Sequence, residues 1–521
     1  MLFSLARPVR FVTLLPFLLA CALAQAQTLH HPPPVAAPAV RAAGSALSAL
    51  PAAATVAATA KTNAASTAAP PAAPPPPPAP LSPPTQAAQS GEPVTGAVPP
   101  TGIGAAAAPT AADAALLSRD ARRIYELSRD KLVQIRTLLR NANTQASIGS
   151  GFFVSADGLI VTNFHVASQL ALEPERYRGV YVTMEGQEGE VELLAFDVQH
   201  DLAVLRAKAR TAAAPVLGFR PAAETLAQGE RIYSLGNPLD IGFAVTEGTY
   251  NGLVKRSFYP RIFFGGTLNP GMSGGPAVDD TGRVVGVNVA KRLDGEQVSF
   301  LIPAEFAQAL VQRAASAKPI TEPAYGEMTR QLTEHQQQLT ERFLQAPFRE
   351  QRHGNYRLPV PDDALARCWG SGRDPAFPGL NLERTQCRAD SDVFAGDFNT
   401  GAVRMSYEAY NAPTLGAARF ARMFSKSFDN ERLQTRGTRH QTAVDCTERY
   451  VTTGSLPLRA VVCMSAYRKL PGLYTMTVLA ASVNQPTQGV LGRMDVQGIA
   501  FDNGMKLASQ YLKAFRWEAA P

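Results

Sequence analysis

Short apolar segments alternate with glycine-containing turns between residue 132 and about residue 314. Residues 132–136 alternate apolar and polar positions, which predicts a strand with one buried face. Residues 149–166 indicate two short strands joined at an Asp-Gly turn, Asp157-Gly158. Helical spacing is rare in this region. The many short strands therefore predict an all-β fold of two packed antiparallel β-barrels, and the length of the region, about 185 residues, suffices for two six-stranded barrels.

The sequence predicts one helix before the barrel region and one helix at its end. Residues 111–128 predict a short helix with an apolar stripe made of Leu116, Ile124 and Leu127. Residues 303–314 predict a second helix that closes the barrel region. We therefore expect a barrel domain over residues 113–317.

The last third of the chain has a different pattern. Residues 318–350 predict a helical connector with one apolar stripe, formed by Met328, Leu332, Leu339 and Phe343. Residues 351–521 mix strand and helix patterns, which predicts a separate α+β domain. Its clearest strand candidates are residues 403–407 and 473–479, and its last helix is expected near residues 504–517.

Four of the five cysteines fall in this α+β region: Cys368, Cys387, Cys446 and Cys463. An even number of cysteines confined to one domain indicates two disulfides in an oxidising compartment. Pairing between sequence neighbours, Cys368 with Cys387 and Cys446 with Cys463, is the arrangement we expect. A four-cysteine metal site is the alternative, although no Cys-x-x-Cys spacing is present.

The first 26 residues have the features of a signal peptide. Arg7 and Arg10 precede a short apolar core over residues 11–20, followed by small residues suited to cleavage. An alternative is a lipoprotein signal, since Leu18 to Cys21 resembles a lipobox with Cys21 as the acylated residue. Both interpretations predict export to the periplasm or cell envelope, with membrane attachment only if Cys21 is lipidated.

Residues 27–112 are rich in Ala and Pro and have few charged or aromatic side chains. Such a segment buries too little apolar surface to offset the entropy of ordering, so a disordered linker is predicted. The formal net charge of the chain, +7, falls to +5 without Arg7 and Arg10. That balance does not indicate nucleic-acid binding.

Candidate chemistry begins in residues 269–276, Asn-Pro-Gly-Met-Ser-Gly-Gly-Pro. Glycines around Ser273 allow sharp backbone turns that can aim N–H groups at a developing negative charge. A serine nucleophile also needs an imidazole base and a carboxylate that orients it. His165 follows the second short strand, and Asp201 precedes an apolar strand. The order His, Asp, Ser is that of the chymotrypsin-type fold.

The chain resembles the trypsin-like serine peptidases of the high-temperature-requirement (Deg) kind from bacterial envelopes, over roughly residues 130–315. The resemblance rests on segments in the order of that family: residues 149–152, 161–166, 201–205, 235–238, 246–248, 271–276, 286–288 and 300–303. It does not extend to a PDZ domain, because no Gly-Leu-Gly-Phe-like loop follows. The family's peptide sensing and oligomer assembly are therefore not expected here.

The resemblance implies a role for each of these residues. Ser273 would be the nucleophile, His165 the general base and acid, and Asp201 the residue that orients His165. The backbone N–H groups of Gly271 and Ser273 would form the oxyanion hole. Taken singly, each residue could instead be an ordinary strand-end, capping or turn residue.

Two neighbouring residues offer competing interpretations. Asp197 is the local rival of Asp201, and the Leu-Ala-Val-Leu segment after Asp201 favours Asp201. His200 suggests a metal ligand, but no second histidine or cysteine lies at ligand spacing. We interpret His200 as an exposed neighbour of Asp201 and expect neither a metal nor a cofactor.

The resemblance places Thr267 at the floor of the primary specificity pocket. An aspartate there would indicate cleavage after Lys or Arg, so Thr267 argues against that preference. Ala290, Lys291 and Arg292 align near another wall of the pocket, where the family usually has apolar residues. Two cations beside the pocket favour acidic substrate residues if they face it; the alternative is that both point to solvent.

The sequence thus predicts an exported serine endopeptidase that acts on envelope polypeptides through an acyl-enzyme. The main alternative is a catalytically latent module that binds a peptide or partner protein. Met272 supports that alternative, since related proteases often have asparagine at this position. An esterase is a third possibility. The α+β domain could dock on an envelope partner or simply add stability.

Overall fold

The computed structural model describes residues 111–209, 215–291, 298–372, 379–429, 433 and 436–518, with side chains described from residue 119 onward. The predicted signal peptide, the alternative lipidation site Cys21 and nearly all of the Ala/Pro-rich segment lie outside these residues.

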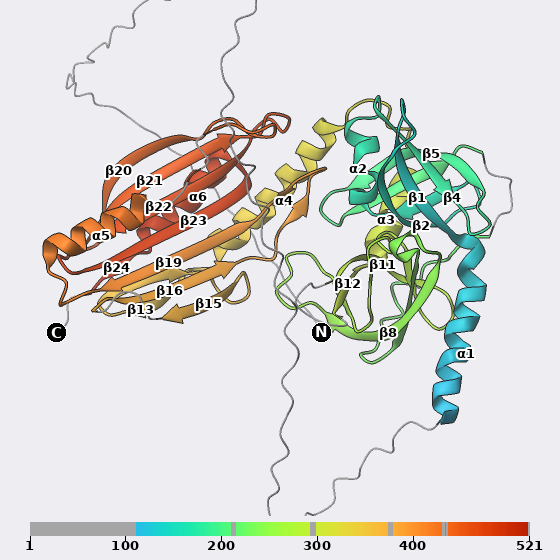
Figure 1. The fold of residues 1–521 in the computed structure, drawn as a ribbon, viewed down its shortest axis with the longest axis horizontal. Coiled ribbons are helices and arrows are strands. Elements are labelled where there is room, and N and C mark those ends of the chain that lie inside the picture. The colour runs from blue at the N-terminus through green and yellow to red at the C-terminus, as the bar shows by residue number, and fades with distance from the viewer. Residues whose placement is uncertain are drawn as a thin grey trace, which may run out of the picture. The chain divides into compact units, whose positions relative to one another are not determined.

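Two closed antiparallel barrels of six strands each confirm the predicted fold class (Figure 1). The first barrel has the strand order β1-β2-β3-β6-β5-β4. Its strands are β1 (Leu132–Leu139), β2 (Gln145–Phe153), β3 (Leu159–Thr162), β4 (Tyr177–Val182), β5 (Glu188–Asp197) and β6 (Leu202–Ala207). The second barrel has the order β10-β11-β12-β9-β8-β7. Its strands are β7 (Arg231–Gly236), β8 (Ala244–Leu253), β9 (Ile262–Phe264), β10 (Pro276–Val278), β11 (Val284–Lys291) and β12 (Ser299–Pro303).

Alternation along the strands explains how the barrels pack together. In β6, Ala203 and Leu205 belong to one hydrophobic cluster, whereas Leu202 and Val204 face another. The second cluster also contains Tyr233 and other core residues of the second barrel, together with helix α3 (Ala304–Ala314). Strand β6 therefore contributes side chains to two hydrophobic clusters, and the cluster it shares with the second barrel holds the two barrels together.

Four short helical elements complete the barrel region: α1 (Ala111–Ser128), η1 (Arg129–Lys131), α2 (Phe164–Leu172) and η2 (Pro238–Asp240). The expected stripe on α1 is only partly correct, and the side chain of its first member, Leu116, lies outside the described residues. Ile124 is fully buried, but Leu127 is 45% exposed. Tyr125 and Ala121 pack beside Ile124 instead. The buried face of α1 is thus shifted by one residue from the stripe expected.

Helix α4 (Tyr325–Gln345) lies within the predicted connector, and all four residues of its expected stripe are buried. Met328 and Leu332 pack in a cluster with the first barrel, whereas Leu339 and Phe343 pack with the C-terminal region. The same helix also buries polar residues: Gln331, His335, Gln336 and Thr340. It therefore contributes to both cores.

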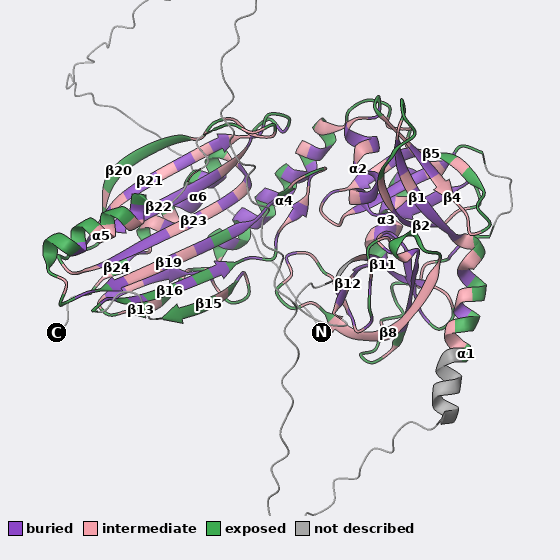
Figure 2. Cartoon of the chain, in the orientation of Figure 1, coloured by how far each residue is buried: buried purple, intermediate pink, exposed green. Residues whose placement is uncertain are grey.

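The C-terminal region is an antiparallel sheet of seven strands in the order β15-β16-β19-β23-β22-β21-β20. These strands are β15 (Arg367–Gly372), β16 (Asn381–Arg388), β19 (Val403–Asn411), β20 (Asp445–Thr453), β21 (Leu456–Ala466), β22 (Leu473–Ser482) and β23 (Gln488–Ala500). Helix α6 (Phe501–Lys513) packs in a cluster with one face of the sheet. Helix α5 (Ala417–Asp429) packs in a cluster with the other face and leaves most of its own surface exposed (Figure 2).

Two smaller elements accompany this sheet. One is a three-stranded sheet of β13 (Arg349–His353), β14 (Tyr356–Val360) and β24 (Arg516–Trp517). The other is a hairpin of β17 (Val393–Phe394) and β18 (Asn399–Thr400).

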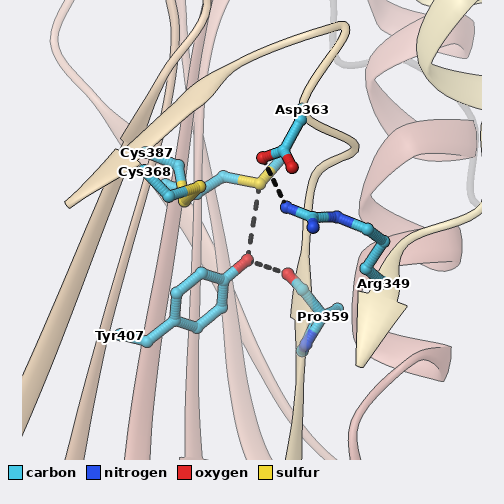
Figure 3. Close-up of a disulfide and its surroundings, with 7 residues drawn as sticks. Arg349, Pro359, Asp363, Cys368, Cys387 and Tyr407 are labelled. Atoms are coloured by element: carbon cyan, nitrogen blue, oxygen red, sulfur yellow. Dashed lines mark hydrogen bonds and ion pairs between the residues drawn. A yellow bond between two sulfur atoms is a disulfide. The ribbon is translucent and has the colours of Figure 1, made fainter. Parts of the chain in front are cut away.

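Both disulfides join the pairs expected from the sequence, Cys368–Cys387 and Cys446–Cys463. The cysteines are cross-strand partners, so each bond ties an edge strand of the seven-stranded sheet to its neighbour. The four-cysteine metal interpretation is wrong because all four sulfurs are paired. Close to Cys368–Cys387, the Tyr407 hydroxyl donates to the Pro359 carbonyl, which links the main sheet to β14 (Figure 3).

Candidate active site

His165 is the second residue of α2, which begins where β3 ends. Phe164, immediately before it, is fully buried, and its ring stacks on Phe196 with centroids 4.9 Å apart. The helix therefore starts from a fixed point in the barrel core. The His165 side chain remains 31% exposed at the barrel surface.

Asp201 lies in the turn between β5 and β6 with a φ of 55°, a left-handed conformation that aspartate adopts more readily than most residues. Its Oδ2 lies 2.6 Å from His165 Nδ1, and its Oδ1 accepts the His165 backbone N–H at 2.8 Å. The Asp201 carbonyl accepts the Phe164 N–H at 3.1 Å and the Asn163 side-chain amide at 2.8 Å. These four contacts fix Asp201 against the first turn of α2.

This pairing sets the protonation of His165. Burial lowers the pKa of His165, but the negative charge of Asp201 and its hydrogen bond outweigh burial, so the pKa is raised overall. With the Asp201 carboxylate accepting from Nδ1, the neutral imidazole carries its proton on Nδ1. Nε2 is then the nitrogen that can accept a proton.

Ser273 lies in the glycine-rich loop before β10. Gly274, the next residue, has a φ of 85°. A Cβ at Gly274 would lie 2.3 Å from the Ser150 carbonyl oxygen and 2.9 Å from the Asn163 backbone nitrogen, so only glycine fits. The Ser273 carbonyl accepts the Ser150 N–H at 2.8 Å. The loop therefore packs directly against the junction of β3 and α2 that carries His165.

The Ser273 hydroxyl donates to the Val289 carbonyl oxygen over 3.4 Å. Among the described residues, this is its only hydrogen bond, and His165 Nε2 has none. Transfer of the hydroxyl proton to His165 therefore requires the Ser273 side chain to leave Val289.

The backbone N–H groups of Gly271 and Ser273 have no acceptor among the described residues. The Pro270 carbonyl, on the peptide plane shared with Gly271, accepts the Leu239 N–H at 2.8 Å. Because a trans peptide points its C=O and N–H in opposite directions, the Gly271 N–H faces away from Leu239. Two unpaired donors two residues apart can bind an oxyanion.

Two buried polar side chains hold this loop; both lie in segments that carry the family resemblance, but neither had a role assigned from the sequence. The Ser150 hydroxyl donates to the Gly271 carbonyl at 2.7 Å and accepts the Asn237 N–H at 2.9 Å. The Asn288 amide donates to the Met272 carbonyl at 3.2 Å, and its Oδ1 accepts the Ser234 hydroxyl at 2.8 Å. Ser150 and Asn288 are nearly inaccessible. A polar residue within a buried strand was the signal available for both.

Met272 points away from the candidate catalytic groups. Its side chain is 1% exposed and packs in the core of the second barrel with Leu268 and Ala277. Its backbone N–H donates to the Asn269 carbonyl at 3.0 Å. Methionine at this position therefore acts as a core residue.

The interpretation of His200 as an exposed residue is wrong. Its side chain is 12% exposed and its Nδ1 lies 2.9 Å from Asp197 Oδ2. The His200 ring also stacks on Phe306, with centroids 3.9 Å apart. Burial alone would raise the pKa of Asp197. The hydrogen bonds and charge of His200 lower the pKa by a larger amount, so the pKa of Asp197 is lowered overall. The two candidate carboxylates therefore have different partners: Asp201 pairs with His165, and Asp197 with His200.

The expected specificity residues are described only in part. Thr267 is exposed. Ala290 and Lys291 pair through β11 with Phe300 and Ser299 of β12. Their side chains, and Arg292 as a whole, lie outside the described residues, so the preference for acidic substrate residues stays a prediction.

No helix within the described ranges is long and apolar enough to cross a membrane.

Residues 149–287 match the family model of the trypsin-like peptidase domain. The chain contains a trypsin-like peptidase domain. His165, Asp201, Gly271 and Ser273 all lie within the matched segment.

Similar proteins include several serine proteases. HhoB of Synechocystis sp., named as a serine protease, is 32% identical over 201 residues, which cover 35% of this chain and 46% of HhoB. Serine protease HTRA1 of Xenopus laevis is 32% identical over 168 residues, covering 31% of this chain and 34% of HTRA1. A DegP-like periplasmic serine endoprotease of Hahella chejuensis is 35% identical over 176 residues, covering 32% and 35%.

A solved structure of the serine endoprotease from Yersinia pestis aligns with a TM-score of 0.32 and 24% identity, covering 37% of this chain and 65% of that chain. The chain spans less than half the length of HhoB, HTRA1 and the Hahella relative. The similarity to these three proteins thus covers about a third of this chain.

Proposed function

We propose that this chain is an exported serine endopeptidase with Ser273 as nucleophile, His165 as general base and acid, and Asp201 as the orienting carboxylate. The observation that carries the proposal is the combination of the Asp201–His165 pair with the unpaired N–H groups of Gly271 and Ser273 in one packed site.

The geometry supports acyl-enzyme hydrolysis in two steps. His165 Nε2 takes the hydroxyl proton while Ser273 Oγ bonds to the scissile carbonyl carbon, and the N–H groups of Gly271 and Ser273 stabilise the resulting oxyanion. The C–N bond then breaks and His165 gives its proton to the leaving amine. Water next attacks the ester with His165 again as base. The acid is released and the Ser273 hydroxyl is regenerated.

Export is supported by the two disulfides of the C-terminal region and by the similarity to a periplasmic DegP-like protease. Envelope polypeptides are therefore the substrates we propose. Docking of the C-terminal region on an envelope partner stays a prediction.

The alternative is a latent module that binds peptides without cleaving them. The Ser273 hydroxyl bonds to the Val289 carbonyl and not to His165, which favours this alternative.

A self-quenched, dye-labelled unfolded protein distinguishes the two functions. The protease hydrolyses it, Ser273→Ala does not, and the acid limb of the pH profile lies above the ordinary imidazole pKa of 6.5. Binding of the unfolded protein without cleavage by the folded wild type would instead support the latent module.

A further inference from the structure

An aromatic residue of the C-terminal region lies against His165. The Phe394 ring, from β17, has its centroid 6.1 Å from that of His165 at an interplanar angle of 79°. It also meets Phe164 edge to face, with centroids 6.2 Å apart. Both distances fall in the range of favourable aromatic pairs. The C-terminal region thus supplies a side chain to the surroundings of the proposed base.

The hairpin that carries Phe394 is short and closed. Val393 pairs with Thr400, and the Ala395 N–H donates to the Phe398 carbonyl at 2.8 Å across the turn. Val393 and Ala395 are almost fully buried in the cluster shared with the first barrel, whereas Phe394 is only partly buried. Because side chains alternate between the two faces of a strand, Val393 and Ala395 anchor the hairpin in this cluster while Phe394 keeps accessible surface.

The hairpin is also fixed to α2, the helix of His165. Ser168 donates its hydroxyl to the Gly396 carbonyl at 3.3 Å. Gly396 has a φ of 98°, and a Cβ there would lie 2.5 Å from Leu172 Cδ1, so the turn approaches α2 as closely as glycine permits. On the other side, the Thr400 hydroxyl bonds to the Tyr467 hydroxyl at 2.9 Å. The position of Phe394 is therefore set before any substrate binds.

We propose that Phe394 forms a wall of a substrate subsite beside His165, which selects a large apolar side chain next to the scissile bond. This inference rests on the proposed protease function. In that function Ser273 Oγ attacks the scissile carbonyl carbon and His165 Nε2 gives a proton to the leaving amine, so the substrate residues next to the scissile bond pass close to the imidazole. A fixed aromatic surface at this place offers apolar contact to P2 or P1′, and it comes from outside the peptidase domain.

The test compares Phe394→Ala with Phe398→Ala in the full chain. Phe398 lies in the same hairpin, but its ring stacks on Tyr467 and lies near His440, not His165. Peptides that carry either Leu or Gly at P2, and separately at P1′, give the ratio of kcat/KM at each position. The rate of Ser273 labelling by a small fluorophosphonate reports the triad without a peptide side chain.

We expect Phe394→Ala to lower the Leu-to-Gly ratio about 5- to 20-fold at one of these two positions, the size of one lost aromatic contact or a little more. Labelling should stay within about threefold of wild type. Phe398→Ala should retain the wild-type ratio, and Phe394→Leu should recover part of it.

Two results would overturn the inference while leaving the proposed function intact. One is a labelled protein whose ratios at both positions are unchanged by Phe394→Ala. The other is a fall in labelling and in kcat/KM for all peptides alike, which would show that Phe394 only supports the position of His165. A folded wild type that is not labelled at all would instead overturn the proposed function, and with it the premise of the subsite.

Discussion

Ser150 offers a sharp test of how the nucleophile loop is held. Its hydroxyl is the partner of both the Gly271 carbonyl and the Asn237 N–H, and the residue is only 1% exposed. Ser150→Ala removes both bonds without adding bulk. The buried Asn237 N–H and the partly buried Gly271 carbonyl are then left without a partner in the wild-type geometry.

Each buried group that loses its partner costs about 1–3 kcal/mol, so we expect a loss of about 2–6 kcal/mol if the loop stays in place. The loop can avoid part of this cost by rotating the Gly271–Met272 peptide, which carries the Gly271 carbonyl and adjoins the peptide of the Gly271 N–H. About 2 kcal/mol lost from transition-state stabilisation corresponds to roughly 30-fold in kcat. This lies below the loss of about 100- to 1,000-fold that follows removal of an oxyanion donor.

The assay is kcat and KM on a fluorogenic peptide, with urea unfolding of the same samples. Ser155→Ala is a matched control, because the Ser155 hydroxyl accepts the Leu159 N–H in a nearby turn of the same barrel. The control should lose stability slightly and keep its kcat. A folded Ser150→Ala variant with wild-type stability and kcat within twofold of wild type would refute this account of the loop.

Three further predictions follow from the structure. Asp201→Asn should lower kcat about 10⁴-fold with the fold intact, because an amide cannot favour the same His165 tautomer; peptide hydrolysis and circular dichroism measure this. Burial lowers the pKa of His335 to about 4, so stability present above pH 6.5 should decline by about 3 kcal/mol as the pH falls to 4, and His335→Gln should flatten this decline in urea titrations. Replacing Cys446 and Cys463 by serine should cost about 2–4 kcal/mol in non-reducing melts.

Each of these predictions has a clear counter-result. A kcat within tenfold of wild type would remove Asp201 from the mechanism. An equal slope of stability against pH in His335→Gln would assign the acid lability to other groups. An unchanged melting temperature in the cysteine double variant would show that the bond does not constrain the unfolded chain.

The barrels and the residues of the candidate site could be predicted because their signals are local. Glycine turns, alternating strands and the surroundings of His165, Asp201 and Ser273 all lie within short segments. The two disulfides were also predictable, since each joins cysteines on two strands that are consecutive in the sequence and paired in the sheet.

Features that depend on distant partners were not predictable. The burial of His200 depends on Phe306, and the role of Ser150 depends on the loop at Gly271, more than 100 residues away. The contact of Phe394 with His165 joins different regions of the chain. A hydrophobic pattern states that a side chain is buried, but not which long-range neighbour buries it.

The central claim is that Ser273 is activated by His165 and Asp201. Intact-mass analysis after treatment with a fluorophosphonate tests it most directly, with Ser273→Ala and His165→Ala as controls. The account predicts one added phosphonyl group on the wild type, mapped to Ser273, with no addition to Ser273→Ala and strongly slowed addition to His165→Ala. A folded wild type that stays unmodified at pH 8, or is modified at another residue, would contradict it.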